Sequence, residues 1–256
     1  MAEFISFAAA GGGPVRVTTP SAAALLADAE ACLAGGRGFA LATINLDHLT
    51  KLRRDPHFAD AYRRQTFVVA DGNPIVWLSK LARRPVRLVP GSELVEPLVA
   101  LAARTGAPLA MLGSTEDALA AAAAKLRSAH PGLEIAALIS PPFGFDPEGE
   151  AADACLAQVA ASGARLCLIA LGAPKQEILA ARGLDKVPGC GFASVGAGVD
   201  FIAGTQKRAP RWVQAVAMEW LWRLLSNPRR LMRRYGACAA LLPQLALEVW
   251  RTRARG

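Results

Sequence analysis

The chain has 256 residues, of which 53% are hydrophobic and 20% are charged. This composition predicts a globular protein that folds around its own core, and it excludes disordered and collagen-like proteins. The formal net charge of +8 is uneven: residues 204–256 carry eleven basic and two acidic side chains, whereas residues 1–203 are nearly neutral. Such an asymmetry predicts a polyanionic partner, which could be nucleic acid, an anionic membrane or a phosphate compound.

The first part of the chain alternates β-rich runs with helical runs, a pattern typical of a parallel α/β sheet. Strands are predicted at residues 15–17, 39–44 and 67–70, with a further short strand at 87–89. Helices are predicted from Thr19-Pro20 to about residue 33, over about 46–64 with a break at Pro56, and over 74–81 and 92–105.

The pattern continues with a βαβ unit made of a strand at 108–112, a helix at 115–129 and a strand at 134–139. Further strands are predicted at 165–171 and 191–195, with a helix at 175–182 between them. The composition changes near Gly204, after which residues 210–225 show one apolar helical face. We therefore predict a parallel α/β core over residues 1–203 and a basic helical appendage over residues 204–256.

The chain shows no signal for secretion or membrane insertion. Residues 1–13 lack a basic start, and the apolar stretch 236–249 is short and interrupted by Pro243 and Gln244. The five cysteines form no CxxC pair and no His/Cys cluster, which argues against disulfides and structural zinc. We expect a cytosolic protein that would meet a membrane only at its surface.

Polar residues follow two of the predicted strands. Asp71-Gly72 ends one strand, and parallel sheets bind their ligands at that edge. Asp71 is therefore a candidate general base, although Asp-Gly alone also suits a simple turn. Thr43 and Asn45 lie at the end of another strand on the same side of the sheet, where Asn45 could equally cap the following helix.

Two strand-to-helix turns could bind a phosphate through backbone N–H groups and helix ends. They are Gly113-Ser114-Thr115 and Gly172-Ala173-Pro174-Lys175-Gln176-Glu177, in which the Gln176 amide could bond a sugar or base. Close packing of strand and helix is the alternative explanation of their glycines. Neither turn has the glycine pattern of a dinucleotide site or a P-loop, so an NAD-dependent oxidoreductase is disfavoured.

Other polar groups carry weaker signals. The acidic stretch 146–150 has no nearby histidine, and the three histidines are isolated, so we predict no metal site and no cofactor. The arginines and tryptophans of the tail suit single-stranded nucleic acid, a membrane interface, a diphosphate or merely a solvated helix.

Taken together, the ordered segments resemble the WecG/TagA/CpsF glycosyltransferase family. The resemblance runs from about Thr43 to Tyr235. It is carried by T-I-N (43–45), V-A-D-G-N-P-I-V-W (69–77), R-L-V-P-G-S-E-L (87–94), M-L-G-S (111–114), P-P-F-G-F (141–145), L-G-A-P-K-Q-E (171–177), G-A-G-V-D-F-I-A-G (196–204) and K-R-A-P-R-W…E-W-L-W-R-L…N-P-R-R-L-M-R-R-Y (207–235).

The resemblance implies a Rossmann-like core and an inverting, metal-independent transfer of a sugar from a UDP-sugar to a polyprenyl-diphosphate-linked saccharide. The donor sugar would be of the N-acetylmannosamine, glucose or glucuronic acid type. The reaction would occur at the inner face of the plasma membrane, in cell-surface polysaccharide synthesis, and the appendage would contact anionic lipid. A homo-oligomer remains open. The alternative is a nucleic-acid-binding α/β protein that uses its Arg-rich tail.

The resemblance also assigns roles to individual residues. Asp71 would be the base that deprotonates the acceptor. The sugar- or acceptor-binding residues would be Thr43, Asn45, Asn73, Arg87 and Gln176, and Asn73 departs from the Gly or Met that many members have there. Gly113, Ser114, Gly172, Lys175 and Gln176 would line the nucleotide. Arg208, Arg223, Arg230 and Arg233 would neutralise diphosphate or contact the membrane.

Overall fold

The computed structural model describes residues 4–206 and 228–253. Its centre is a six-stranded sheet in the order β4-β3-β8-β7-β5-β6, in which every neighbouring pair is parallel. The strands are β3 (Phe39–Ile44), β4 (Phe67–Ala70), β5 (Leu109–Gly113), β6 (Ile135–Ile139), β7 (Leu166–Ala170) and β8 (Gly191–Ser194). The predicted parallel α/β sheet is confirmed.

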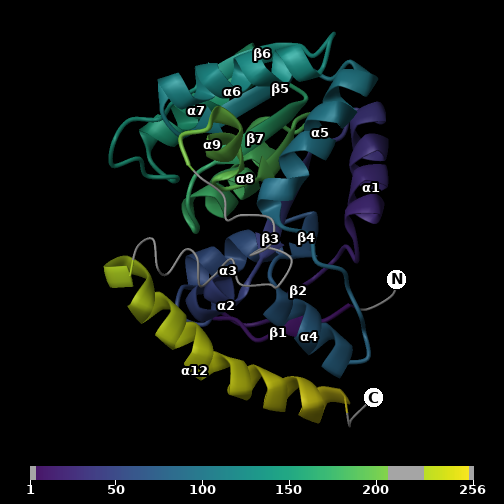
Figure 1. Cartoon of the computed structure of the whole chain (residues 1–256), viewed down its shortest axis with the longest axis vertical. Coiled ribbons are helices and arrows are strands. Elements are labelled where there is room, and N and C mark those ends of the chain that lie inside the picture. Colours follow the sequence, from purple (N-terminus) through teal and green to yellow (C-terminus); the bar gives the residue numbers. More distant parts are fainter. Residues whose placement is uncertain (1–3, 207–227, 254–256) are drawn as a thin grey trace.

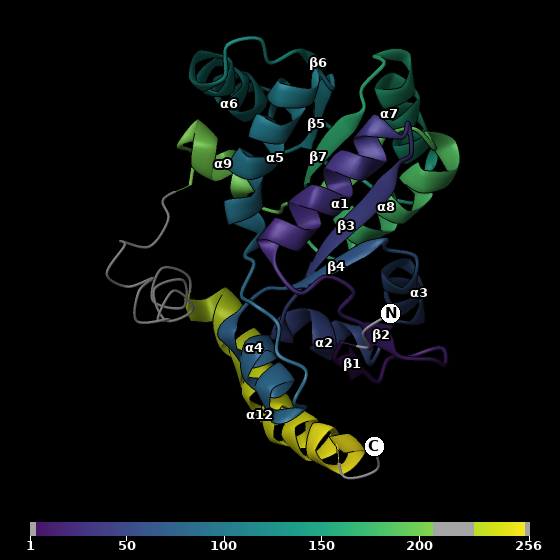
Figure 2. The ribbon, with the colours of Figure 1, turned by 90° about the vertical axis from the view of Figure 1, so that its right-hand side faces the viewer.

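Helices cover both faces of this sheet (Figures 1 and 2). One face packs against α1 (Ala22–Ala34), α5 (Gly91–Thr105), α6 (Glu116–Ala129) and α9 (Gly198–Ala203), and the other against α7 (Glu150–Ala161) and α8 (Lys175–Lys186). Side chains along each strand alternate between the two apolar clusters, as Leu109 and Met111 do against Ala110 and Leu112. The helix-covered parallel architecture predicted from the sequence is therefore confirmed.

A third apolar cluster lies at the β4 end of the sheet. It joins α2 (Leu46–Leu52), α3 (Pro56–Arg63), α4 (Asn73–Leu81), a small antiparallel pair of β1 (Ser6–Phe7) and β2 (Val15–Arg16), and α12 (Pro228–Arg253). Figures 1 and 2 both show α12 running beside α2 and α4. Leu241, Leu245 and Val249 form its buried face in this cluster.

Two ion pairs add to this contact between α12 and α2. Arg234 Nε lies 2.7 Å from Asp47 Oδ1, and Arg53 Nη2 lies 2.5 Å from Glu248 Oε2. Asp47 is itself buried and also pairs with Lys51 at 2.9 Å. The end of the chain is thus packed against the core, and the division at residue 204 stays a prediction.

Several predicted boundaries were wrong. Residues 15–16 pair with β1 outside the main sheet, and residues 87–89 form no strand, although the Val89 N–H donates to the Ala70 carbonyl. The first helix begins after Ser21, whose hydroxyl accepts from the Ala24 N–H, and therefore not at Thr19-Pro20. The local cap thus outweighs the Pro signal.

The sequence reading also missed two helices. Glu150, assigned to an acidic loop, is the first residue of α7, where negative charge stabilises a helix start. Helix α9 has only six residues and follows a glycine-rich turn, so it shows no helical periodicity. The predicted helix at 210–225 lies outside the described residues. None of the helices that are described is long and apolar enough to cross a membrane.

Candidate active site

The parallel sheet brings the candidate residues to one edge. Asn45, Asp71 and Ser114 directly follow β3, β4 and β5, and Gly172 and Gly196 lie two residues beyond β7 and β8. Because the carboxyl ends of parallel strands meet at the same edge, these five positions share one side of the molecule. The topology therefore places these candidate positions at one edge, and their roles in a site stay predictions.

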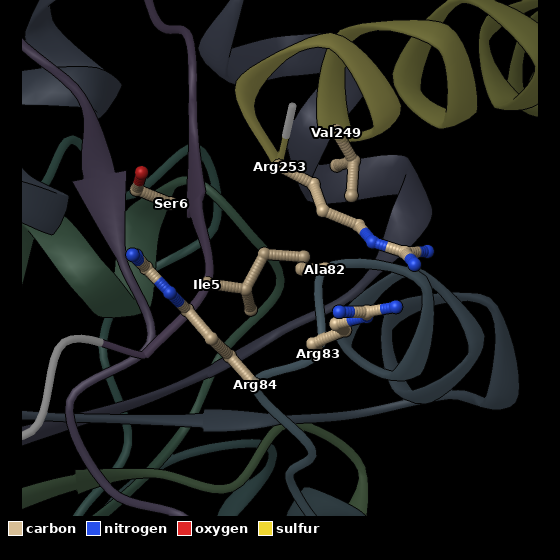
Figure 3. A pocket seen from close by; sticks show the side chains of 7 residues that line it. All are labelled: Ile5, Ser6, Ala82, Arg83, Arg84, Val249 and Arg253. Carbon is tan, nitrogen blue, oxygen red and sulfur yellow. The ribbon is translucent and has the colours of Figure 1, made fainter. Parts of the chain in front are cut away.

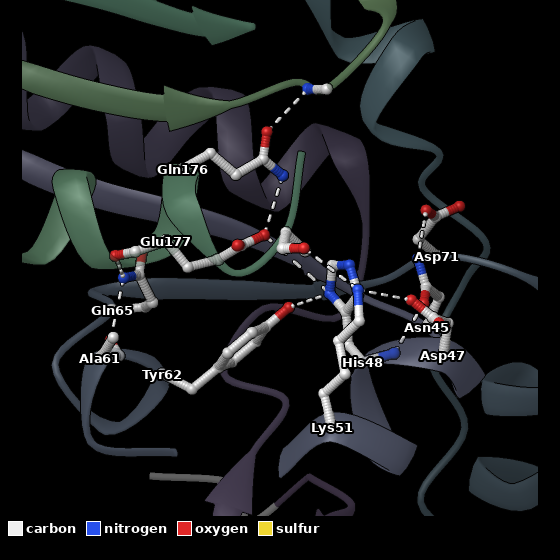
Figure 4. Close-up of polar contacts among 12 residues, drawn as sticks. Asn45, Asp47, His48, Lys51, Ala61, Tyr62, Gln65, Asp71, Gln176 and Glu177 are labelled. Atoms are coloured by element: carbon white, nitrogen blue, oxygen red, sulfur yellow. Dashed lines mark hydrogen bonds and ion pairs between the residues drawn. The ribbon is translucent and has the colours of Figure 1, made fainter. Parts of the chain in front are cut away.

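Asp71 and Asn45 are in direct contact. Asn45 Nδ2 donates to Asp71 Oδ2 at 3.3 Å, while Asn45 Oδ1 accepts from the His48 N–H at 3.0 Å and caps α2 (Figure 4). The predicted helix cap is therefore confirmed, and the role of Asn45 in substrate binding stays a prediction. The Asp71 N–H donates to the Ile44 carbonyl at 2.8 Å, which fixes the backbone under a half-buried carboxylate.

Thr43 and Asn73 are close to this pair in the chain, two residues before Asn45 and two residues after Asp71. Thr43 is buried, and a Cβ added to Gly91 at the start of α5 would lie 3.1 Å from its Oγ1. Thr43 therefore supports the start of α5, and its contact with a substrate stays a prediction. Asn73 is half-buried and is the first residue of α4, two residues after Asp71.

A buried polar network lies behind this edge. The amide of Gln176 is used at both ends: Oε1 accepts from the Gly196 N–H at 3.1 Å, and Nε2 donates to Glu177 Oε1 at 2.8 Å. Glu177 is fully buried and lies 4.0 Å from His48 Nδ1, which shares a 2.6 Å hydrogen bond with the Tyr62 hydroxyl. Figure 4 shows this group joining α2, α3 and α8.

Burial decides the charges in the network. It raises the pKa of Glu177 to about 7, although the Gln176 hydrogen bond acts in the opposite direction. Burial, assisted by the Lys51 ammonium, lowers the pKa of His48 to about 3, and burial also raises the pKa of Tyr62. The imidazole is therefore neutral at pH 7, and Glu177 gains or loses its proton near that pH.

This predicts a pH-dependent effect of Glu177→Gln. The folded pKa of Glu177 lies above the ordinary value of 4.5, so the folded wild type holds its proton more tightly than the unfolded chain does. The unfolding free energy of the wild type therefore decreases as the pH rises from about 4.5 to 7, and the variant lacks this decrease. We expect the unfolding free energy of the variant to increase relative to that of the wild type by on the order of 2 kcal/mol across this range. Urea unfolding at several pH values measures this difference.

Glu116→Gln, at an exposed position in the first turn of α6, is the matched control. Its stability relative to wild type should not change over the same pH range. A Glu177→Gln difference that is equally flat would show that the Glu177 carboxyl is not kept protonated by burial.

The turn after β5 is tightly constrained. Gly113 has φ +111°, and an added Cβ would lie 2.4 Å from the Ala170 carbonyl oxygen of β7. Ser114 follows with φ +58°, and its hydroxyl donates to Asp200 Oδ1 of α9. Asp200 was not among the predicted site residues, although it lies in the quoted block 196–204.

The turn after β7 differs from it. A Cβ added at Gly172 meets no atom within 4 Å, so this turn faces open space. Lys175 Nζ donates to the Phe145 carbonyl at 2.6 Å and thereby holds the loop at 141–145. Among the described residues, no group of three or more His, Cys, Asp or Glu side chains could hold a metal ion.

Comparison with known protein families gives a match over nearly the whole chain. A family model described as the glycosyl transferase WecG/TagA/CpsF family matches residues 12–256. The chain belongs to this family. The match begins earlier and ends later than the segment from Thr43 to Tyr235 that we quoted from the sequence, so α12 is included in it.

Membership in the WecG/TagA/CpsF family identifies a glycosyltransferase of cell-surface polysaccharide synthesis, which acts on a sugar donor and an acceptor. The structure describes the remaining predicted residues only in part. Arg87 is exposed on the loop before α5, and Arg208 and Arg223 lie outside the described residues. Arg230 and Arg233 fall within α12, but their side chains are not described.

Proposed function

We propose that the protein transfers a sugar from a UDP-sugar to a polyprenyl-diphosphate-linked saccharide, with inversion and without a metal ion. The observation that carries the proposal is the Asp71 carboxylate, which is half-buried at the carboxyl edge of the sheet and held by the Asn45 amide. The Asn45 amide orients the Asp71 carboxylate at the edge where parallel sheets bind their ligands, which is where a general base would meet a substrate hydroxyl.

A single base is enough for this chemistry. Asp71 would remove the proton of the acceptor hydroxyl while its oxygen attacks the anomeric carbon from the side opposite the nucleotide. The new C–O bond forms as the bond to UDP breaks, and UDP leaves with the electron pair. One displacement inverts the anomeric centre, and the proton on Asp71 then passes to water.

The donor would lie along the two turns. Gly172 leaves room for a ligand beside the start of α8, and Gly113 and Ser114 bring the neighbouring turn to the same edge. Gln176 would act by shaping the Gly196 turn, since both ends of its amide are bonded within the protein. Lys175 would contact the nucleotide after releasing the Phe145 carbonyl.

The leaving diphosphate needs positive charge. In this proposal Arg208, Arg223, Arg230 and Arg233 supply it, with Arg87 contacting the donor or its diphosphate, because fixed cations stabilise charge that develops in the transition state. The basic tail then serves two purposes, at the diphosphate and at the membrane.

Exposed apolar side chains support a membrane-facing surface. Met232, Leu247 and Trp250 are exposed on α12, and Trp77 is exposed on the adjacent α4. Tryptophan suits the headgroup level of a bilayer, and the tail adds arginines that attract anionic lipid. We propose that this side of the molecule lies against the inner face of the plasma membrane.

The experiment is UDP release by the purified full chain, with UDP-linked N-acetylmannosamine, glucose and glucuronic acid, with and without a polyprenyl-diphosphate-linked sugar. We expect release that requires the acceptor and favours one donor. Addition of EDTA should leave the rate unchanged. Loss of activity with EDTA would contradict the metal-independent route, and acceptor-independent release from every donor would contradict the transfer.

A further inference from the structure

A chain of polar contacts connects α12 with the turn that follows β7. Arg234 of α12 binds the Asp47 carboxylate of α2 through a 2.7 Å contact between Nε and Oδ1. The other oxygen of Asp47, Oδ2, lies 2.9 Å from Lys51 Nζ, one helical turn further along α2 (Figure 4). Lys51 Nζ in turn donates to the Ala173 carbonyl at 3.1 Å. Segments that are far apart in the sequence are thus joined in order.

The middle of this chain of contacts is fixed because Asp47 is buried. Its side chain is 9% exposed, whereas the side chains of Lys51 and Arg234 are 34% and 42% exposed. A carboxylate that is removed from water is stable only when nearby cations compensate its charge. Asp47 therefore holds one cation at each of its oxygens, and Lys51 keeps the orientation in which it reaches Ala173.

Ala173 belongs to the turn that would hold the donor nucleotide. It follows Gly172, where an added Cβ meets no atom within 4 Å. The Lys175 N–H donates to the Gly172 carbonyl at 2.9 Å, which closes the turn. Ala173 also packs against the apolar cluster that includes Leu241 of α12. The turn is thus supported by the cluster that seats α12 as well as by the polar contacts.

We propose that Lys51 and Asp47 are positioning residues for the sugar donor, and that Arg234 extends their support to α12. The hydrogen bond from Lys51 fixes the Ala173 carbonyl, and thereby the direction of the backbone N–H groups that a phosphate would meet in this turn. Without it, the conformation that binds the nucleotide would be less populated, and the donor would bind more weakly. The inference rests on the proposed function, in which the donor lies along this turn.

The contacts also connect the seating of α12 with donor binding. Arg234 reaches Asp47 only when α12 lies against α2, so the seated helix stabilises the arrangement that holds Ala173. By linkage, a nucleotide that favours this arrangement also favours the seated helix. Donor affinity should therefore depend on an arginine whose own contact is with α2.

The other end of α12 supplies a matched control. Arg253 Nη1 donates to the Leu81 carbonyl of α4 at 3.5 Å, and Arg253 lines a cavity of about 330 Å³ there (Figure 3). This contact also joins α12 to the core through one arginine, but at the end of α4. Arg253→Gln therefore removes the same charge from the same helix and leaves the Asp47–Lys51 pair in place.

The test is the affinity of the full chain for UDP, measured by calorimetry, with the melting temperature determined in parallel. Lys51→Met should raise the Kd about tenfold and Arg234→Gln about fivefold, within the range for loss of a charge-assisted hydrogen bond. Lys51→Arg, which keeps a charged donor, should restore most of the affinity. Arg253→Gln should change the Kd by less than about twofold. The double variant of Lys51→Met and Arg234→Gln should match Lys51→Met alone, because Arg234 acts through Lys51.

The transfer assay separates positioning from chemistry. The KM for the donor should rise with the Kd in Lys51→Met, whereas kcat should change by less than about twofold. A lower melting temperature with unchanged UDP affinity would show a purely structural contact and overturn the proposal. Multiplied effects in the double variant would overturn the connection between Arg234 and Lys51. Comparison of Arg234→Gln with Arg253→Gln decides the question even if Lys51→Met does not fold.

The same measurements distinguish this inference from the proposed function. UDP binding that weakens as expected in the variants, without sugar transfer by the wild type, would contradict the proposed function alone. Sugar transfer with equal UDP affinity in all variants would contradict the positioning role alone. A wild type that does not bind UDP would contradict both.

Discussion

Asp71→Asn should lower kcat for acceptor-dependent UDP release by about 10³-fold, within the range that removal of a general base produces. An amide cannot accept the proton of the acceptor hydroxyl, whereas its oxygen can still receive the hydrogen bond from Asn45 Nδ2. The fold and the affinity for the donor should therefore survive the substitution. The measurement is the initial rate at saturating donor, with the melting temperature and UDP affinity determined in parallel.

The matched control is Asp60→Asn, which removes an exposed carboxylate from α3. It should retain the wild-type rate. A folded Asp71→Asn variant with more than a tenth of wild-type kcat would show that Asp71 is not the base. A loss of kcat that is accompanied by a lower melting temperature would instead indicate a structural role for Asp71.

Gly113→Ala should destabilise the protein by about 3 kcal/mol or more. The residue has φ +111°, which is outside the regions open to alanine, and the added Cβ would lie 2.4 Å from the Ala170 carbonyl oxygen. That oxygen belongs to the backbone of a central strand and accepts the Ser114 N–H, so it cannot move aside alone. Urea unfolding followed by circular dichroism measures the effect.

Gly172→Ala provides the comparison. Gly172 lies in the equivalent turn after β7, but a Cβ added there meets nothing within 4 Å. The unfolding free energy of the Gly172→Ala variant should therefore differ from that of the wild type by less than about 0.5 kcal/mol. If the nucleotide lies along this turn, the same variant should bind UDP more weakly. Equal destabilisation by the two substitutions would contradict the steric explanation for Gly113.

The main architecture could be predicted because its signals are local. Apolar strand segments alternate with helices of ordinary length, and Asp71 and Asn45 stand immediately after two of these strands. Parallel pairing then brings both residues to one edge without further information. Asn73 and Lys175 could be placed near this edge by the same argument, although their contacts could not.

The buried network could not be predicted. Glu177 belongs to the polar sequence Lys175-Gln176-Glu177, which suggests an exposed helix start, yet it is fully buried against His48 and Tyr62. These partners come from α2 and α3, which lie far from α8 in the chain, and no periodicity relates them to Glu177. The Ser114–Asp200 contact is similar, since it depends on a six-residue helix that follows a turn.

The packing of α12 affects how shortened versions of the protein should be interpreted. Helices α2 and α4 start directly beside Asn45 and Asp71, and α12 braces both through Leu241, Leu245 and the Arg234–Asp47 pair. Removing the tail would uncover the apolar sides of these helices and loosen the support beneath Asp71. Loss of activity in a truncated enzyme would therefore reflect lost rigidity as well as any loss of the proposed lipid contact. Replacing the exposed side chains of Leu247 and Trp250 tests the proposed lipid contact without disturbing that support.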